Sequence, residues 1–226
     1  MKTYFLIAQA TYDHVEIGLF NKSTLIAQQA LEKSSANKLL VQTIDNLLAD
    51  NNISVSHLSF IAVNKGPAPF TTLRVVLATI NGISFASGIK LIGIDGLRAF
   101  ALEFEDKRWP YTAYLLNAFN NDVYYALQQP HVPLQIGCGN INQLLTSFDS
   151  SKEYEWRFCG NGASLHAQTI ASHIKKNFFP EPIVNQCSLE FLAQQALIMY
   201  ENSEFSDHQA LPLYLKETAY KKAVQQ

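Results

Sequence analysis

Two glycine-containing turns are the first places in this sequence where chemistry is conceivable, because each lies between an expected strand and an expected helix. A turn of this kind can present backbone N–H groups to a bound phosphate. Gly66-Pro67-Ala68-Pro69 carries two prolines, which lack that N–H, so it is a poor phosphate cradle. Gly160-Asn161-Gly162-Ala163 is better placed, but a lone G-x-G without the rest of a nucleotide-binding fingerprint is more often a tight turn.

The other polar residues do not group into a recognisable active site. No two of the six histidines lie four apart on a helix, as a zinc pair requires, and no carboxylate or cysteine completes a set with His166 and His173. There is no G-x-S-x-G turn. Asp13, Asp45 and Asp95 are the acids nearest the expected cleft, and Asp95 is better placed to cap the helix after it. The sequence therefore predicts no catalytic residue, no metal and no cofactor.

Composition restricts the classes of function. Charged residues make up 16% of the chain and the formal net charge is −2, which argues against strong direct binding to nucleic acid. The three cysteines have unrelated spacings and are expected to be reduced thiols of a cytoplasmic protein. The N-terminal residues do not have the pattern of a signal peptide. No apolar run approaches the roughly 20 residues of a membrane span.

A β-α-β unit between Phe60 and Asp95 is the stretch around which the chain is organised. The apolar runs 60–63 and 90–94 are short enough to be buried strands. A helix over 72–87 joins them, and this connection demands parallel pairing of the two strands. The hydroxyl group of Thr71 or Thr72 is expected to cap the helix.

The helix over 72–87 has two distinct sides. Leucine, valine and isoleucine residues follow one side at three- and four-residue steps, whereas Ala78, Gly82 and Ala86 repeat every four residues on another. Small residues at this step let a second backbone come close. Gly82 costs a helix about 1 kcal/mol relative to alanine, so close approach is a reason for its presence. Packing onto the sheet and a role in an interface both remain open explanations.

The order of the elements repeats in the two halves of the chain. In the first half, strands are expected over 4–10, 15–20 and 24–31, a helix over 35–48, the β-α-β unit, and a helix over 97–104. In the second half, the expected strands are 111–117, 123–128, a weak one near 135, and 155–159, with helices over 141–148, 164–177 and 189–200. A three-strand meander followed by αβα, occurring twice, is the plan of the actin-like (ribonuclease H-like) α/β fold. It predicts an N-terminal subdomain 1–104 and a smaller subdomain 105–226, each with a mixed sheet flanked by helices, and the last helix is a candidate to pack back on the first subdomain.

Several motifs carry a family resemblance. The stretch Gly66-Pro67-Ala68-Pro69-Phe70-Thr71-Thr72-Leu73-Arg74, followed by Leu77-Ala78-Thr79, Gly82 and Phe85-Ala86, resembles the GPGSFTGLR…LA…KG…A signature of the TsaB (YeaZ) family. Further matches follow in the family's order: Lys38-Leu39-Leu40 with Ile44-Asp45-Asn46-Leu47-Leu48, Asp122-Val123-Tyr124, Gly160-Asn161-Gly162-Ala163 and Pro212-Leu213-Tyr214-Leu215-Lys216. The resemblance spans nearly the whole chain, and the shared order makes it specific.

The resemblance implies a function without catalysis. TsaB is an actin-like partner protein in the bacterial machinery that makes threonylcarbamoyladenosine (t6A) at A37 of tRNA. It binds and stabilises TsaD, its catalytic homologue, and TsaE, an ATPase, joins the pair. TsaD carries an H-x-x-x-H metal pair, which this chain lacks. The chain is therefore expected to be a pseudo-enzyme that meets tRNA only through the complex and forms a homodimer in the absence of TsaD.

The resemblance also implies an interface, because the family's contact with TsaD is a bundle of the first two helices of the N-terminal subdomain. Carried over to this sequence, the interface comprises Leu40, Ile44, Leu47, Leu48, Leu73, Arg74, Leu77, Ala78, Gly82 and Ala86. The adjoining signature loop contributes Gly66, Pro67, Phe70 and Thr71.

The sequence departs from the family at several motif positions. Gln9-Ala10-Thr11 stands where the family's first strand usually ends in Asp-Thr-[SA], whose aspartate serves nucleotide–metal binding in actin-like ATPases. Ala68, Pro69 and Thr72 replace a glycine, a serine and a glycine of the signature, and Ser35 replaces a frequent histidine. Asn117-Ala118-Phe119 replaces D-A-R. ATP hydrolysis by the chain alone is then less expected, and partner specificity has room to differ.

Two alternatives to the partner role stay open. One is an active actin-fold enzyme, either a small-molecule kinase or a peptidase-like relative, which turnover of a nucleotide by the purified chain would favour. The other is a protein that only pairs with itself through the same two helices.

Overall fold

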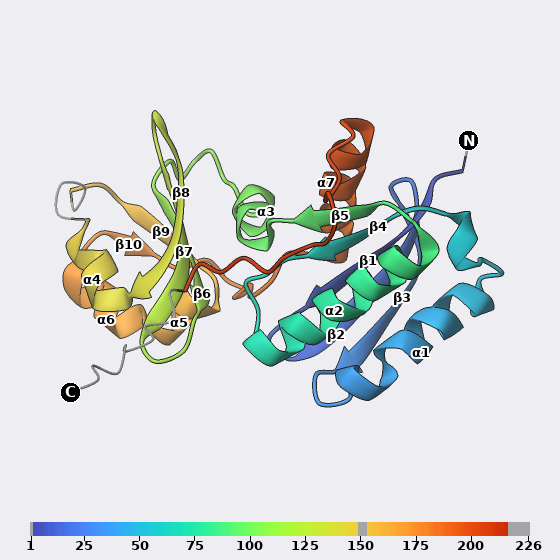
Figure 1. Ribbon diagram of the computed structural model, residues 1–226. Helices are drawn as coiled ribbons and strands as arrows, with labels where there is room; N and C mark the ends of the chain where they lie inside the picture. The colour runs from blue at the N-terminus through green and yellow to red at the C-terminus, as the bar shows by residue number, and fades with distance from the viewer. Residues whose placement is uncertain (1, 149–152, 217–226) are drawn as a thin grey trace, which may run out of the picture. The chain divides into compact units, whose positions relative to one another are not determined.

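The computed structural model describes residues 2–148 and 153–216, which form two compact units (Figure 1). The first unit comprises the described residues up to Glu105 together with Asn185–Leu213, and the second comprises the described residues of Asp106–Val184 and those from Tyr214 onward. The division predicted from the sequence placed the boundary after residue 104 and made the last helix a candidate to pack back on the first subdomain. In the structure residues 185–213, which contain this helix, lie with the first unit and complete its core.

The first unit is built on a five-stranded mixed sheet. Its strands, in spatial order, are β3 (Thr24–Glu32), β2 (His14–Asn21), β1 (Tyr4–Ala10), β4 (Leu58–Asn64) and β5 (Leu91–Ile94). β1, β2 and β3 form an antiparallel meander, whereas β4 and β5 run parallel to β1. A short 3-10 helix, η1 (Val55–His57), precedes β4. The parallel pairing predicted for the β-α-β unit is confirmed.

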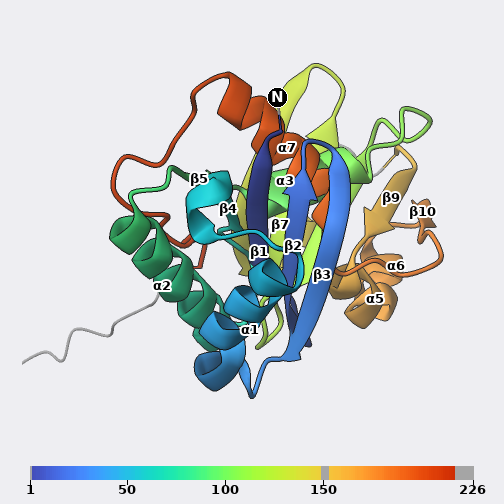
Figure 2. The same cartoon turned by 90° about the vertical axis from the view of Figure 1, so that its right-hand side faces the viewer.

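Both faces of this sheet are apolar, and helices cover each of them. Phe5 and Ile7 of β1 pack with α3 (Gly96–Glu103) and α7 (Leu189–Glu201), whereas Leu6 and Ala8 pack with α1 (Ala36–Asp50) and α2 (Phe70–Ser87). Successive strand residues point to opposite faces, so a continuous apolar run needs cover on both. Figure 2 shows α1 and α2 side by side over one face, and α7 on the other.

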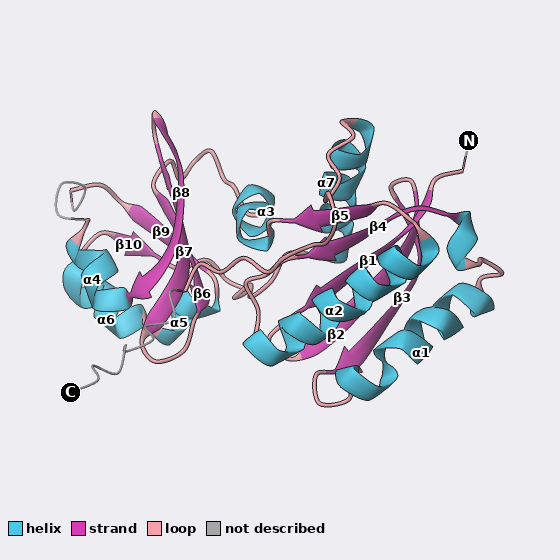
Figure 3. Cartoon of the chain, viewed as in Figure 1, coloured by secondary structure: helices cyan, strands magenta, loops and turns pink. Residues whose placement is uncertain are grey.

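The second unit repeats this topology with smaller helices (Figure 3). Its strand order is β10 (Asn177–Phe178), β9 (Trp156–Cys159), β6 (Thr112–Asn117), β7 (Asp122–Gln129) and β8 (Val132–Asn140). β6, β7 and β8 form the meander, and β9 and β10 are added in parallel. Its helices are α4 (Ile141–Thr146), α5 (Asn161–Leu165) and α6 (Ala167–His173). The predicted fold, two mixed sheets flanked by helices in a repeated order, is confirmed.

The helix predicted over 164–177 is wrong in its extent. The structure has two short helices, α5 and α6, which meet at His166, where φ is −108° and ψ is 19° and the backbone is therefore not helical. Asn177, the predicted last residue of the helix, begins β10, which pairs with β9. The hydrophobic periodicity and the composition of the sequence did not reveal this strand, because it is only two residues long.

Of the two N-caps predicted from the sequence, the one for α2 is wrong and the one for α3 is confirmed. Pro69 occupies the N-cap of α2 without a side-chain hydrogen bond, so neither Thr71 nor Thr72 is the cap. Asp95 caps α3, because its Oδ1 accepts a hydrogen bond from the backbone N–H of Arg98 at 2.9 Å. Pro133 lies inside β8. β8 is an edge strand, and edge positions tolerate the missing N–H.

The segment after α7 runs along the first unit as an extended strap, residues 206–213. The backbone N–H of Ser206 donates to the carbonyl of Leu91 at 2.8 Å, and that of Leu213 donates to the carbonyl of Lys65 at 3.0 Å. Between them, the side-chain amide of Asn81 on α2 donates to the Ala210 carbonyl at 3.1 Å and accepts from the Ala210 N–H at 2.7 Å. Ala210 is 1% exposed. One side-chain amide therefore holds the strap against α2.

Replacing Asn81→Ala is expected to loosen the strap and to destabilise the first unit by about 1–3 kcal/mol, because the buried N–H and carbonyl of Ala210 lose their partners. Urea unfolding measures the loss, and hydrogen exchange at the Ala210 amide locates it. Asn46→Ala is the matched control, since Asn46 is exposed and its side-chain oxygen accepts a hydrogen bond from Gln42 of its own helix at 2.9 Å. Equal effects of the two substitutions would contradict the role of Asn81.

Candidate functional site: a filled strand edge and an open helix face

The carboxyl ends of β1 and β4 meet at one edge of the first sheet, where open α/β sheets commonly bind their ligands. Each of these two strands carries a buried amide near its end. Gln9 is the next-to-last residue of β1 and is 0% exposed, and Asn64 ends β4 and is 7% exposed. Gln9 stands in the motif where the TsaB resemblance leads one to expect an aspartate.

Hydrogen bonds join these amides into a chain. The side-chain N–H of Asn64 donates to Oε1 of Gln9 at 3.2 Å. The Nε2 of Gln9 donates to a carboxylate oxygen of Glu16 at 2.8 Å and to the carbonyl of Cys187 at 3.0 Å. The other carboxylate oxygen of Glu16 accepts from Gln186 at 2.9 Å. The oxygen and both N–H groups of the Gln9 amide are thus already committed to the protein.

The signature turn is filled by its own residues in the same way. The backbone N–H of Gly66 donates to Oδ1 of Asn64 at 2.9 Å. A Cβ atom at Gly96 would lie 2.0 Å from that same oxygen and 2.5 Å from the carbonyl of Gly66, so the turn packs directly against the start of α3. Gly66 itself has φ of 104°, which only glycine adopts readily. This turn positions β4, β5 and α3, and it does not offer the Gly66 N–H to a phosphate.

The turn at Gly160 also has a packing role. A Cβ atom at Gly160 would lie 2.2 Å from the carbonyl oxygen of Leu115, so β6 approaches the turn closely. Oδ1 of Asn161 accepts a hydrogen bond from the backbone N–H of Asn117 at 2.9 Å. The interpretation of G-N-G-A as a tight turn explains these contacts, and a ligand is not needed to account for the glycines.

Thiol and metal chemistry find little support among the described residues. Burial raises the pKa of both Cys138 and Cys159 to about 11, so these thiols stay protonated at neutral pH. Burial and the neighbouring carboxyl of Glu103 raise the pKa of Cys187 further. No group of three or more histidine, cysteine, aspartate or glutamate residues is arranged to hold a metal ion within 2–148 and 153–216.

The second candidate region is the pair of helices α1 and α2, where the structure corrects the predicted interface. Six of the ten interface residues are at most 6% exposed and pack in the core of the first unit: Leu40, Ile44, Leu47, Leu48, Leu73 and Leu77. They hold α1 and α2 on the sheet and are not available to a partner. The prediction placed these residues in the interface, but a helix that packs on a sheet buries its widest apolar side against that sheet.

The remaining predicted residues lie on the opposite side of α2. Phe70, Arg74, Ala78, Gly82 and Ala86 follow each other at four-residue steps and are exposed. Phe85 lies beside them and is 90% exposed. We call these six residues the outer face of α2. A Cβ atom added at Gly82 would meet nothing within 4 Å, so the row of small residues leaves an open strip along the helix.

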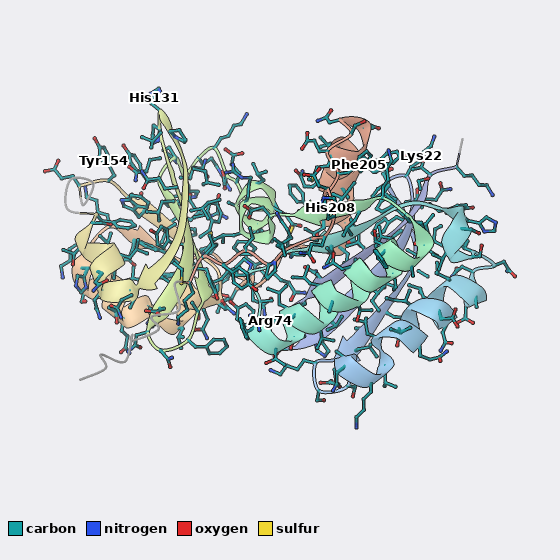
Figure 4. The ribbon with its side chains drawn as sticks, in the orientation of Figure 1. Lys22, Arg74, His131, Tyr154, Phe205 and His208 are labelled. Atoms are coloured by element: carbon teal, nitrogen blue, oxygen red, sulfur yellow. The ribbon has the colours of Figure 1, made fainter. Side chains whose placement is uncertain are left out.

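Two rings and one guanidinium group border this open strip. The guanidinium of Arg74, labelled in Figure 4, lies 3.7 Å from the centre of the Phe70 ring, which fixes both side chains at the start of the helix. On α1, Leu39 is 47% and Val41 62% exposed. The sequence analysis did not include Phe85, Leu39 and Val41 among the interface residues. Their positions outside the buried stripe of each helix were the signal that could have identified them.

α2 is unusually apolar for a helix with so much exposed surface. Of the helices in the described residues, it alone has the length and mean hydropathy (18 residues, 1.2) of a membrane-spanning segment. One side of α2 packs on the sheet, but buried residues make up only 28% of the helix. Its row of valine, leucine and isoleucine explains part of the hydropathy, and the outer face of α2 explains the rest.

The sequence matches, over residues 32–221, the family described as "TsaD: tRNA N6-adenosine threonylcarbamoyltransferase". The chain belongs to this family. Two curated relatives are named tRNA threonylcarbamoyladenosine biosynthesis protein TsaB. The one from Haemophilus influenzae is 27% identical over 97 residues (42% of this chain, 41% of the relative), and the one from Buchnera aphidicola is 23% identical over 101 residues (45% and 48%). The chain thus spans less than half the length of the curated relatives it matches.

Solved structures share the fold at low sequence identity. YeaZ from Pseudomonas aeruginosa is 19% identical, with a TM-score of 0.66 over 94% of this chain and 100% of that one. A Pseudomonas aeruginosa protein with similarity to peptidase YEAZ gives 0.69 at 16% identity, over 95% and 100%. A Bacteroides thetaiotaomicron protein with an actin-like ATPase fold gives 0.50 at 8% identity, over 86% and 96%. The predicted TsaB (YeaZ) resemblance and the actin-like fold are confirmed.

Replacing Gln9→Glu is expected to destabilise the protein by about 3–5 kcal/mol at pH 7, because it buries a charge beside the carboxylate of Glu16. Burial and Glu16 raise the folded-state pKa of the new carboxyl above its unfolded value of about 4.3. The folded state then binds the extra proton, so stability falls as pH rises from about 4. Urea unfolding at a series of pH values tests this.

Gln9→Met is the control, because it removes the hydrogen bonds of the Gln9 amide without adding a charge. Its loss of stability relative to the unmodified protein is expected to be independent of pH. If Gln9→Glu shows the same flat dependence, the carboxylate has found solvent or a cation, and the edge is more open than the amide chain indicates.

Proposed function

We propose that this chain is a non-catalytic partner protein of the TsaB type. It binds and stabilises a TsaD homologue and, together with a TsaE homologue, supports t6A modification of tRNA at A37. The family membership and the TsaB names of the curated relatives support a place in t6A biosynthesis. The partner role within it rests on two features of the first unit, the amide chain and the outer face of α2.

The observation that carries the proposal is the outer face of α2. Phe85 at 90% and Phe70 at 57% exposure are large apolar side chains that gain about 1.5–3 kcal/mol each when a partner buries them. On the same face, Ala78, Gly82 and Ala86 let a facing helix approach at the short end of the usual 8–10 Å range. A helix pair of the partner is the occupant that such a strip fits.

The amide chain supports a role without catalysis. An actin-like ATPase needs an acidic group for its nucleotide-bound metal ion, and at this edge Gln9 bonds to Asn64, Glu16 and Cys187. The active kinase or peptidase-like enzyme is therefore the weaker alternative. The homodimer would use the same outer face, so we propose it as the state of the chain without TsaD.

Two further parts of the proposal rest on charge and on the cysteines. With a net charge of −2 the chain is a poor ligand for tRNA on its own, so we propose that it meets tRNA only within the complex. We also propose a cytoplasmic location, in keeping with the three free cysteines and the pathway named for the relatives.

Co-purification with the TsaD homologue of the same source tests the interface. Gly82→Leu is expected to abolish the stoichiometric complex, because a leucine side chain fills the strip that the facing helix needs. The fold is expected to survive, since leucine favours a helix more than glycine by nearly 1 kcal/mol. Gly139→Leu is the matched control: its Cβ also meets nothing within 4 Å, but it lies on β8 in the second unit.

Loss of the complex in Gly82→Leu alone, with unchanged thermal unfolding, is the expected result. If the unmodified chain forms no complex at micromolar concentrations, the partner role is wrong. If both variants bind equally well, the interface lies elsewhere.

A separate assay decides between partner and enzyme. The purified chain, without TsaD or TsaE, is expected to show no turnover of ATP above background in the presence of Mg²⁺. Turnover that disappears in a Gln9→Met variant would place an active site at this edge and replace the proposal by the enzymatic alternative.

A further inference from the structure

A groove on the second unit has no part in the proposed partner role. It has a volume of about 780 Å³, within the range of ligand-binding clefts, and all of its lining residues belong to the second unit. Its walls come from the segment before β6, the segment before β9, and β10 with the residues after it. The lining is rich in aromatic residues and proline.

Two parallel ring pairs form the ridges of this groove. Trp109 and Phe178 stack at 4.6 Å between ring centres with an interplanar angle of 4°. Tyr111 and Tyr154 stack at 4.3 Å with an angle of 10°. Tyr154, labelled in Figure 4, is 49% exposed, and Phe178 is 40% exposed. Half-exposed aromatic rings that line a groove are a surface of the kind that a ligand or partner covers.

Backbone hydrogen bonds hold the ridges in place. The N–H of Arg157 donates to the Tyr111 carbonyl at 3.0 Å, which ties the Tyr111 segment to β9. The hydroxyl of Thr112 donates to the Trp109 carbonyl at 2.8 Å. The N–H of Trp156 donates to the Lys176 carbonyl at 3.0 Å and so fixes the start of β10. Because hydrogen bonds hold the backbone that carries these rings, ordering the rings on binding costs a ligand little free energy.

The charges along the groove favour a cationic ligand. The guanidinium of Arg108 lies 2.7 Å from the carboxylate of Asp106, so this pair is neutral overall, and Asp106 keeps its charge because Arg108 lowers its pKa to about 2. Arg157 is 91% buried, its exposed fraction being 9%. Glu155 and Glu181 are exposed on the rim. The accessible charge is thus negative, which disfavours nucleic acid.

We propose that this groove binds a proline-rich peptide segment that carries a lysine or arginine. A polyproline II helix has three residues per turn and no internal hydrogen bonds, and it docks its proline rings between parallel aromatic ridges. Pro110 and Pro180 complete the rigid apolar walls, and the basic side chain meets Glu155 or Glu181. A smaller hollow of about 240 Å³ shares Pro180 and Glu181 with the groove and gives room for the next turn of the peptide.

A peptide array tests the proposal, and the fluorescence of Trp109 reports binding. The chain has two tryptophans, of which Trp156 is 0% exposed and Trp109 lines the groove. The array holds a constant P-x-x-P frame and varies the remaining positions, with lysine, arginine, alanine or glutamate at either end. Peptides with a basic end are expected to change Trp109 emission, and the same peptides with alanine in place of proline are not.

Variants locate the binding site. Tyr154→Ala removes one ring of an exposed pair and is expected to weaken binding about tenfold. Glu181→Lys is expected to weaken binding of the basic peptides and to reduce its salt dependence, while leaving alanine-ended peptides unaffected. Phe119→Ala is the control, because Phe119 is an exposed ring (53%) of the same unit outside the groove.

Three results would overturn the proposal: no peptide of the array binds the unmodified chain, binding is equal in Tyr154→Ala and Phe119→Ala, or a single-stranded oligonucleotide changes Trp109 emission more strongly than any peptide. Circular dichroism of each variant separates loss of binding from loss of fold, and Glu181→Lys provides a second readout if Tyr154→Ala unfolds. The test uses the chain alone, so its outcome is independent of complex formation with TsaD.

Discussion

The central sheet of the first unit is apolar on both faces, and the rest of that unit follows from the need to cover it. α1 and α2 come from the chain between the strands and cover one face. No helix of sufficient length remains between β4 and residue 105 for the other face, so α7 returns from the far end of the sequence to supply it. The strap after α7 then lies against α2 and β5. The discontinuous first unit is thus a consequence of hydrophobic burial.

The same constraint decides what α1 and α2 can offer to a partner. Most of their leucines and isoleucines are buried against the sheet, because each helix packs its broad apolar side there. On α2 the outward side carries mainly small and aromatic residues: alanine and glycine along the middle, with Phe70 and Phe85 near its ends. A surface of this composition is stable in water only at a cost, which the proposed contact with a second protein would remove.

At the polar edge of the first sheet, hydrogen bonds within the protein occupy the buried polar side chains. An amide at Gln9 donates and accepts at once, so it joins Asn64, Glu16 and Cys187 in one chain of hydrogen bonds. An aspartate at this position can only accept when ionised, and would need a cation beside it. The carboxamide of Gln9 therefore bonds within the protein at a position where the TsaB resemblance leads one to expect an aspartate.

The sequence by itself determined most of the strands, the repeated order of elements and the family, because short apolar runs, turn residues and motif order are local properties. β1 was predicted with its observed bounds for this reason. Only the tertiary structure decided which side of α2 faces water, that His166 divides a helix, that β10 pairs with β9, and that Trp109 stacks on Phe178. Each of these depends on contacts between residues far apart in the chain, and periodicity shows that a helix has an apolar side without showing what covers it.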